Sequence, residues 1–133
     1  MTQPEEDVVT KLDSAVAALT KNTNLSVGAM PAKGVNVPSK FVAVLASGGP
    51  APQAFQSSAV ELRFASVQCL CRGEPRDQPG ALALARSVRN ALHHVAIAGY
   101  VNIECEQSEP LHAGEDEQGH HLYSVNVSLW HEQ

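Results

Sequence analysis

The chain has 133 residues, of which 44% are hydrophobic and 17% charged, a composition that predicts one globular domain over residues 1–133. Its formal net charge is −5 and it contains no cluster of Lys and Arg, which argues against a role in binding nucleic acid tightly. A secretory signal and a membrane-spanning run are also lacking, and the three cysteines show no framework spacing, which together favour a cytoplasmic protein without a membrane partner.

An amphipathic helix is expected at the N-terminus. Thr2 and Glu5 have the spacing of a capping box, and Pro4 suits a first helical turn. Lys21 and Asn22 are expected to mark the end of the helix. The apolar side chains that recur at helical spacing form one stripe, made of Val8, Leu12, Val16 and Leu19.

Strand patterns and turn residues alternate in the middle of the chain. Leu25–Met30 is a short strand candidate, and a loop with prolines and a glycine follows it. Phe41–Ala46 is almost wholly apolar, which is typical of a strand buried on both faces, and SGGPAP after it predicts a turn. Val60–Arg72 is long for one strand. Because its apolar residues change parity, a bulge is expected near Ala65-Ser66.

The second half of the chain predicts a helix and then a hairpin. The helix runs from about Gly80 to Val95, with Asp77 as its N-cap. Tyr100–Glu106 and Leu122–Trp130 alternate apolar and polar residues and form the two arms, and Ser108–Gly119 between them reads as a polar loop. The element order predicts an α+β fold, with a mixed, mostly antiparallel sheet of about four to five strands packed by two helices and a C-terminal β-hairpin.

The stretch GEDEQGHH contains the residue types of a metal or acid/base site. A calcium loop requires acids at alternate positions, whereas Glu115, Asp116 and Glu117 are consecutive. His120 and His121 are adjacent at the start of a strand and therefore point to opposite faces. The spacing favours the solvated tip of a hairpin. A small ligand- or metal-binding domain or enzyme that uses these acids and histidines is the alternative.

No motif in the chain supports catalysis. Cys69, Cys71 and Cys105 lie in alternating apolar patterns, which favours buried core positions over reactive thiols. Ser47-Gly48-Gly49 lacks the Gly-Lys-Ser/Thr of a phosphate-binding loop, and no nucleophile signature of the GxSxG kind occurs. The chain is therefore expected not to be an enzyme and to need no cofactor.

The order of several short features, from about Val42 to Trp130, resembles the tail terminator or minor capsid (tail-completion) proteins of long-tailed bacteriophages. Individually these motifs are short, and their succession carries the resemblance. They are Gly48-Gly49 after the buried strand, VQCLCRG ending in Arg72, the helix DQPGALALARSVRNAL, Glu109-Pro110-Leu111, Asp116 with Gly119, and Tyr123-Ser124-Val125-Asn126.

The resemblance implies a structural protein of the virion, assembled in the bacterial host cytoplasm. Six copies would form a ring at the head-proximal end of the tail tube, end tube polymerisation and join the head-tail connector, while DNA passes through the lumen without specific binding. A neck protein on the head side of the same joint is the nearest alternative. The residues expected at the subunit or lumen interface are Arg72, Glu109, His112, Glu115, Asp116, Glu117 and His120.

Overall fold

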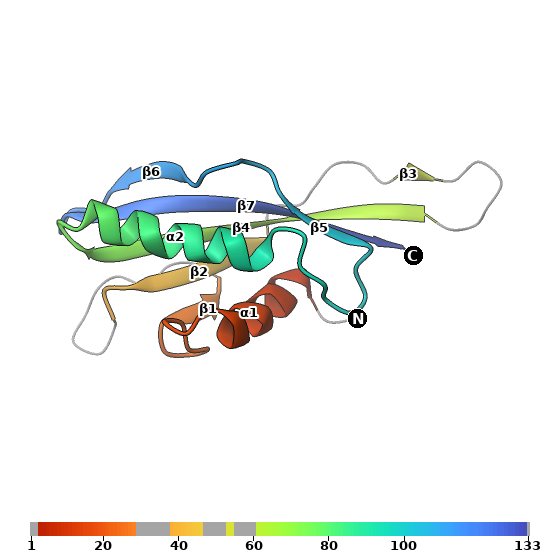
Figure 1. Ribbon diagram of the computed structural model, residues 1–133, viewed down its shortest axis with the longest axis horizontal. Helices are drawn as coiled ribbons and strands as arrows, with labels where there is room; N and C mark the ends of the chain where they lie inside the picture. Colours follow the sequence, from red (N-terminus) through yellow and green to blue (C-terminus); the bar gives the residue numbers. More distant parts are fainter. Residues whose placement is uncertain (1–2, 29–37, 47–52, 55–60, 133) are drawn as a thin grey trace.

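The computed structural model describes residues 3–28, 38–46, 53–54 and 61–132 (Figure 1). Within these ranges the chain forms two helices and one sheet of seven strands. The elements in chain order are α1 (Pro4–Ala15), β1 (Leu25–Val27), β2 (Phe41–Ala46), β3 (Gln53–Ala54), β4 (Glu61–Pro75), α2 (Gln78–Leu92), β5 (Asn102–Cys105), β6 (Leu111–Glu115) and β7 (His120–Glu132). The loop expected after Leu25–Met30 and the SGGPAP turn fall largely outside the described residues.

The strand order in the sheet is β1-β2-β4-β7-β5, with β3 beside β4 and β6 beside β7. β1 runs parallel to β2, and every other described pair is antiparallel. The predicted α+β class with a mixed, mostly antiparallel sheet is therefore confirmed. The sheet has more strands than expected because β3 follows the predicted SGGPAP turn, where no strand was expected, and β6 lies in the segment predicted as a loop.

The long strands β4 and β7 form the centre of the sheet. They pair in one continuous register from Leu62–Glu132 to Arg72–Leu122, and the register shifts only between Arg72 and Pro75. The bulge predicted near Ala65-Ser66 is therefore wrong. The apolar residues of this strand change from even to odd positions because they lie on different faces of the sheet. Phe64 faces away from the helices and packs edge-on against Trp130 on the neighbouring strand, with ring centroids 5.5 Å apart.

Both helices pack on the same face of the sheet, beside one another (Figure 1). Alternate side chains of each strand point toward the helices, and these side chains form the core together with the buried faces of the helices. Central core members are Val67, Cys69, Cys71, Leu84, Ala85, Val88, Leu92, Val125, Val127 and Leu129. The helix α2 lies so close to β4 that a Cβ atom on Gly73 would stand 2.6 Å from Cβ of Ala81.

The first helix is shorter than its apolar stripe predicted. It ends at Ala15, whereas Val16 and Leu19 remain buried in the turn that follows. Asn24 stabilises this turn, because its side chain accepts the Thr20 N–H at 2.7 Å and donates to the Ala18 carbonyl at 2.8 Å. Burial of an apolar residue at helical spacing therefore does not require that residue to be helical.

The second helix begins as predicted. The Asp77 carboxylate accepts the N–H of Gly80 at 2.9 Å, which confirms Asp77 as the N-cap. The helix ends at Leu92 rather than Val95, and His94 then adopts a positive φ of 56°. No helix in the described ranges has the length and apolar character needed to cross a bilayer.

Candidate functional site at the β6–β7 hairpin

Most of the predicted interface residues lie on one hairpin, at the end of the sheet where β4 leads into α2 (Figure 1). The segment predicted as a polar loop, Ser108–Gly119, contains the strand β6, which pairs with β7 from Leu111–Ser124 to Glu115–His121. The loop prediction is wrong there because LHAGE is an edge strand whose side chains are mostly exposed. A strand without a buried face shows no apolar alternation in its sequence.

Asp116 organises the tight turn between β6 and β7. Its Oδ1 accepts the N–H groups of Gln118 and His120, both at 2.9 Å. Gly119 completes the turn with a φ of +84°, and its N–H donates to the Asp116 carbonyl at 3.2 Å. Partial burial acts to raise the pKa of the Asp116 carboxyl, but the hydrogen bonds from His120 and Gln118 outweigh it and hold this pKa below its usual value.

His120 is buried beneath this turn, with 1% of its surface exposed. Its Nδ1 lies 2.8 Å from Oδ2 of Asp116, and its Nε2 has no hydrogen-bond partner in the part of the chain that the structure describes. His121 points to the other side of the strand, where its ring meets β6. The expectation that the adjacent histidines face apart is confirmed, so they do not form one site.

Arg72 is also buried, with 2% of its surface exposed. Its guanidinium donates from Nε to the Ser39 carbonyl and from Nη2 to the Pro38 carbonyl, each at 2.9 Å, and lies 5.8 Å from the centre of the Phe41 ring. Desolvation lowers the pKa of Arg72, while the nearby Asp116 carboxylate acts in the opposite direction. Arg72 therefore ties β4 to the segment before β2 within one subunit.

The remaining predicted residues face solvent. Glu109 pairs with Arg86 of α2 at 2.9 Å between Oε2 and Nε, with both side chains more than half exposed. His112, Glu115 and Glu117 are exposed on β6 and its turn. Glu109, His112, Glu115 and Glu117 are thus available to a neighbouring molecule, Asp116 is partly available, and Arg72 and His120 are not.

Sequence reasoning gave no contact role to Leu111 or Tyr123, and it considered His121 only as part of the alternative metal- or ligand-binding site. His121 and Tyr123 contact His112 across the hairpin, with 3.1 Å between His112 Nε2 and His121 Nδ1 and 5.0 Å between the His112 and Tyr123 rings. Leu111 is 47% exposed on the edge strand. The strand β6 would have had to be recognised first, because these contacts follow from its register with β7.

The described side chains offer no catalytic arrangement. Burial raises the pKa of Cys71 to about 12 and that of Cys105 to about 11, so both thiols stay protonated in the core, as the sequence predicted. No group of three or more His, Cys, Asp or Glu side chains that could hold a metal occurs in the described ranges. The alternative of a site built jointly from His120, His121 and the acids has no support in this geometry.

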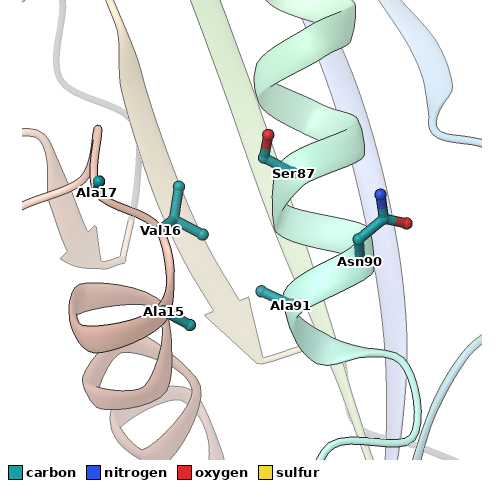
Figure 2. A pocket seen from close by; sticks show the side chains of 6 residues that line it. All are labelled: Ala15, Val16, Ala17, Ser87, Asn90 and Ala91. Atoms are coloured by element: carbon teal, nitrogen blue, oxygen red, sulfur yellow. The ribbon is translucent and has the colours of Figure 1, made fainter.

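A shallow groove separates the end of α1 from α2 (Figure 2). Its lining carries no charged group, and consists of Ala15, Val16, Ala17, Ser87, Asn90 and Ala91. Small neutral side chains of this kind provide neither an acid/base pair nor a nucleophile with a base. The groove is a boundary between packed helices, and the hairpin remains the candidate site.

Comparison with known proteins supports a structural protein. A family model described as bacteriophage tail terminator protein matches residues 6–129. Among solved structures, a chain from the virion of a native gene transfer agent (GTA) particle is similar in fold, with a TM-score of 0.59 and 15% sequence identity, and the match covers 98% of this chain and 95% of that one. None of the curated proteins compared with the chain is a significant match.

Proposed function

Since the chain belongs to the bacteriophage tail terminator protein family and is a structural protein of the virion, we propose that six copies form a ring at the head-proximal end of the tail tube. The ring ends tube polymerisation and joins the tail to the head connector. The observation that carries this proposal is the family match over residues 6–129. Members of this family are typically not enzymes.

The two edges of the sheet support closure into a ring. A ring built from one kind of subunit needs two different surfaces that fit each other head to tail. The sheet ends in β1 and the short β3 on one side and in β5 and β6 on the other. The end of α2 already occupies part of the β5 edge, because the His94 N–H donates to the Ile103 carbonyl at 2.8 Å and the Cys105 N–H donates to His93 Nδ1 at 3.1 Å.

The strand β6 is the more open part of that edge. It pairs with β7 on one side, and Leu111 exposes 47% of its surface there. Exposed edge strands offer unpaired backbone groups to another chain. We therefore place the subunit contact along β6, with Glu109, His112, Glu115 and Glu117 at its border.

The sheet face opposite the helices is suited to a lumen through which DNA passes. The described strand positions on this face, from β2 to β7, carry no Lys, and their one Arg, Arg72, is buried. Neutral polar groups predominate in the middle, namely Ser66, Gln68, Ser124, Asn126 and Ser128. Since nonspecific DNA affinity comes mainly from exposed cations, such a wall in a net acidic protein permits sliding without binding.

The test of this proposal is assembly in solution. Native mass spectrometry and negative-stain images of the purified chain should show six-membered rings. Mixing with the tube protein of the same phage should give tubes that carry one ring at one end and no longer grow. A strict monomer that never joins tubes would contradict the proposal, and binding to the connector alone would favour a neck protein instead.

A further inference from the structure

Two histidines face each other across the β6–β7 hairpin. Nε2 of His112 and Nδ1 of His121 are 3.1 Å apart, on neighbouring strands. The other ring nitrogen of His121, Nε2, lies 3.1 Å from Oε1 of Glu115. His112 is exposed and the His121 side chain is 15% exposed, so a small ion in solvent can reach the pair.

The order of these contacts determines where the lone pairs point. When His121 donates its Nε2–H to Glu115, its Nδ1 keeps a lone pair on the side of the ring that faces His112. A carboxylate that accepts the outer N–H of an imidazole is the usual support of a metal-binding histidine, because it sets the tautomer and the ring orientation. The Tyr123 ring, 5.0 Å from the His112 ring, packs against His112 and limits its rotation.

The spacing of the two nitrogens also suits a shared ion. Two imidazoles bound to one tetrahedral zinc at about 2.0–2.1 Å place their nitrogens about 3.3 Å apart. The observed separation of 3.1 Å needs an adjustment of a few tenths of an ångström, which two partly exposed side chains on an edge hairpin allow. A direct hydrogen bond between neutral rings is the competing explanation of the same distance.

We propose that His112 and His121 form a surface site for one divalent transition metal ion of the class that prefers imidazole, such as Zn²⁺, Ni²⁺ or Cu²⁺. Water fills the remaining coordination positions, and Glu115 is a positioning residue. Two nitrogen ligands do not suit Mg²⁺ or Ca²⁺, which prefer oxygen. The site goes beyond the proposed function and does not rest on ring formation.

The experiment is a titration of the full, untagged chain with each metal ion separately, and isothermal titration calorimetry measures the binding. We expect saturable binding of one ion per chain, tightest for Cu²⁺, and no binding of Mg²⁺. His112→Gln and His121→Gln should each weaken binding by at least about tenfold, and Glu115→Gln by about tenfold through loss of orientation. The matched control is His94→Asn, which removes one ring of the stacked pair His93–His94 elsewhere in the chain.

Circular dichroism without metal would show whether each variant is folded, and a thermal melt with and without Ni²⁺ gives a second readout. The melting temperature of the wild-type chain should rise with Ni²⁺, and that of His121→Gln should not. Lack of saturable binding by the wild-type chain would overturn the proposal. Equal loss of binding in His94→Asn and His121→Gln would overturn it as well, and neither result bears on whether rings form.

Discussion

At the scale of single residues, Arg72 and His120, two of the buried polar side chains near the hairpin, differ in their hydrogen bonding. Arg72 donates to two backbone carbonyls, whereas Nε2 of His120 has no hydrogen-bond partner among the described residues although the residue is 1% exposed. An unsatisfied buried nitrogen costs about 1–3 kcal/mol. His120 is tolerated because Asp116 binds its Nδ1 and closes the turn above it.

Replacing Asp116 by Ala should therefore lower the free energy of unfolding by about 2 kcal/mol at pH 7, because two backbone hydrogen bonds and the contact with His120 are lost. Urea denaturation of wild type and variant measures this difference. Glu117→Ala is the matched control, because Glu117 is exposed in the same turn and should change stability little.

The same comparison at lower pH tests the ionisation of Asp116. The pKa of this carboxyl is lower in the folded chain than its usual value, so the carboxylate stabilises the fold above the unfolded-state pKa of about 3.9. That contribution is lost as the pH falls through the folded-state pKa. A difference between wild type and Asp116→Ala that stays constant down to pH 2 would contradict this account.

At the scale of elements, the distance between α2 and β4 depends on one glycine. A Cβ on Gly73 would lie 2.6 Å from Cβ of Ala81 and 2.8 Å from its Cα. Gly73→Ala should therefore destabilise the chain by about 1–3 kcal/mol through overpacking. The melting temperature and urea denaturation measure the effect.

A second substitution separates this contact from a general effect on β4. In the double variant Gly73→Ala with Ala81→Gly, the Cβ of residue 81 that would lie nearest the new Cβ on residue 73 is gone. The double variant should therefore lose less stability than the sum of the losses of the two single variants. The recovery is partial because Cα of Ala81 remains close and glycine weakens the helix by about 1 kcal/mol. Strictly additive losses would show that the two residues do not clash.

At the scale of the whole molecule, the sheet has helices on one face and, on the other, a cation-poor strand surface with polar side chains near its middle. In the proposed ring, this asymmetry would give two distinct walls, and the exposed edge β6 would give the contact between subunits. Leu111 is the exposed apolar residue on that strand. Since an apolar side chain buried between subunits contributes to assembly, its replacement by a charge should oppose ring closure.

Leu111→Lys should leave the subunit folded but shift it from rings to monomers. Analytical ultracentrifugation at several concentrations measures the shift, and far-UV circular dichroism checks the fold. Ala83→Lys is the control, since Ala83 is exposed on α2 and is not part of the strand β6. If both variants form rings of equal stability, the subunit contact does not lie along β6. The proposal that the chain forms a ring is unaffected by that result.

Local patterns predicted much of the fold. The apolar run Phe41–Ala46 forms a strand with the bounds expected, Asp77 caps the second helix, and the three cysteines are buried. The sequence identified the acids and histidines of the hairpin as a region of interest. It did not predict which of these residues are buried and which are exposed. His112 and His121 are nine positions apart, and only the pairing of β6 with β7 brings their rings together.

By itself, the sequence determined most of the helical and extended segments and the resemblance to the tail terminator family, because periodicity, capping and motif order are local properties. Only the tertiary structure decided that Phe64 belongs to the face away from the helices, that LHAGE is an edge strand, and that Arg72 is held inside the subunit. The physical reason is that strand register and face are set by partners distant in the chain, so residues with the same local pattern become core, surface or contact according to what they pair with.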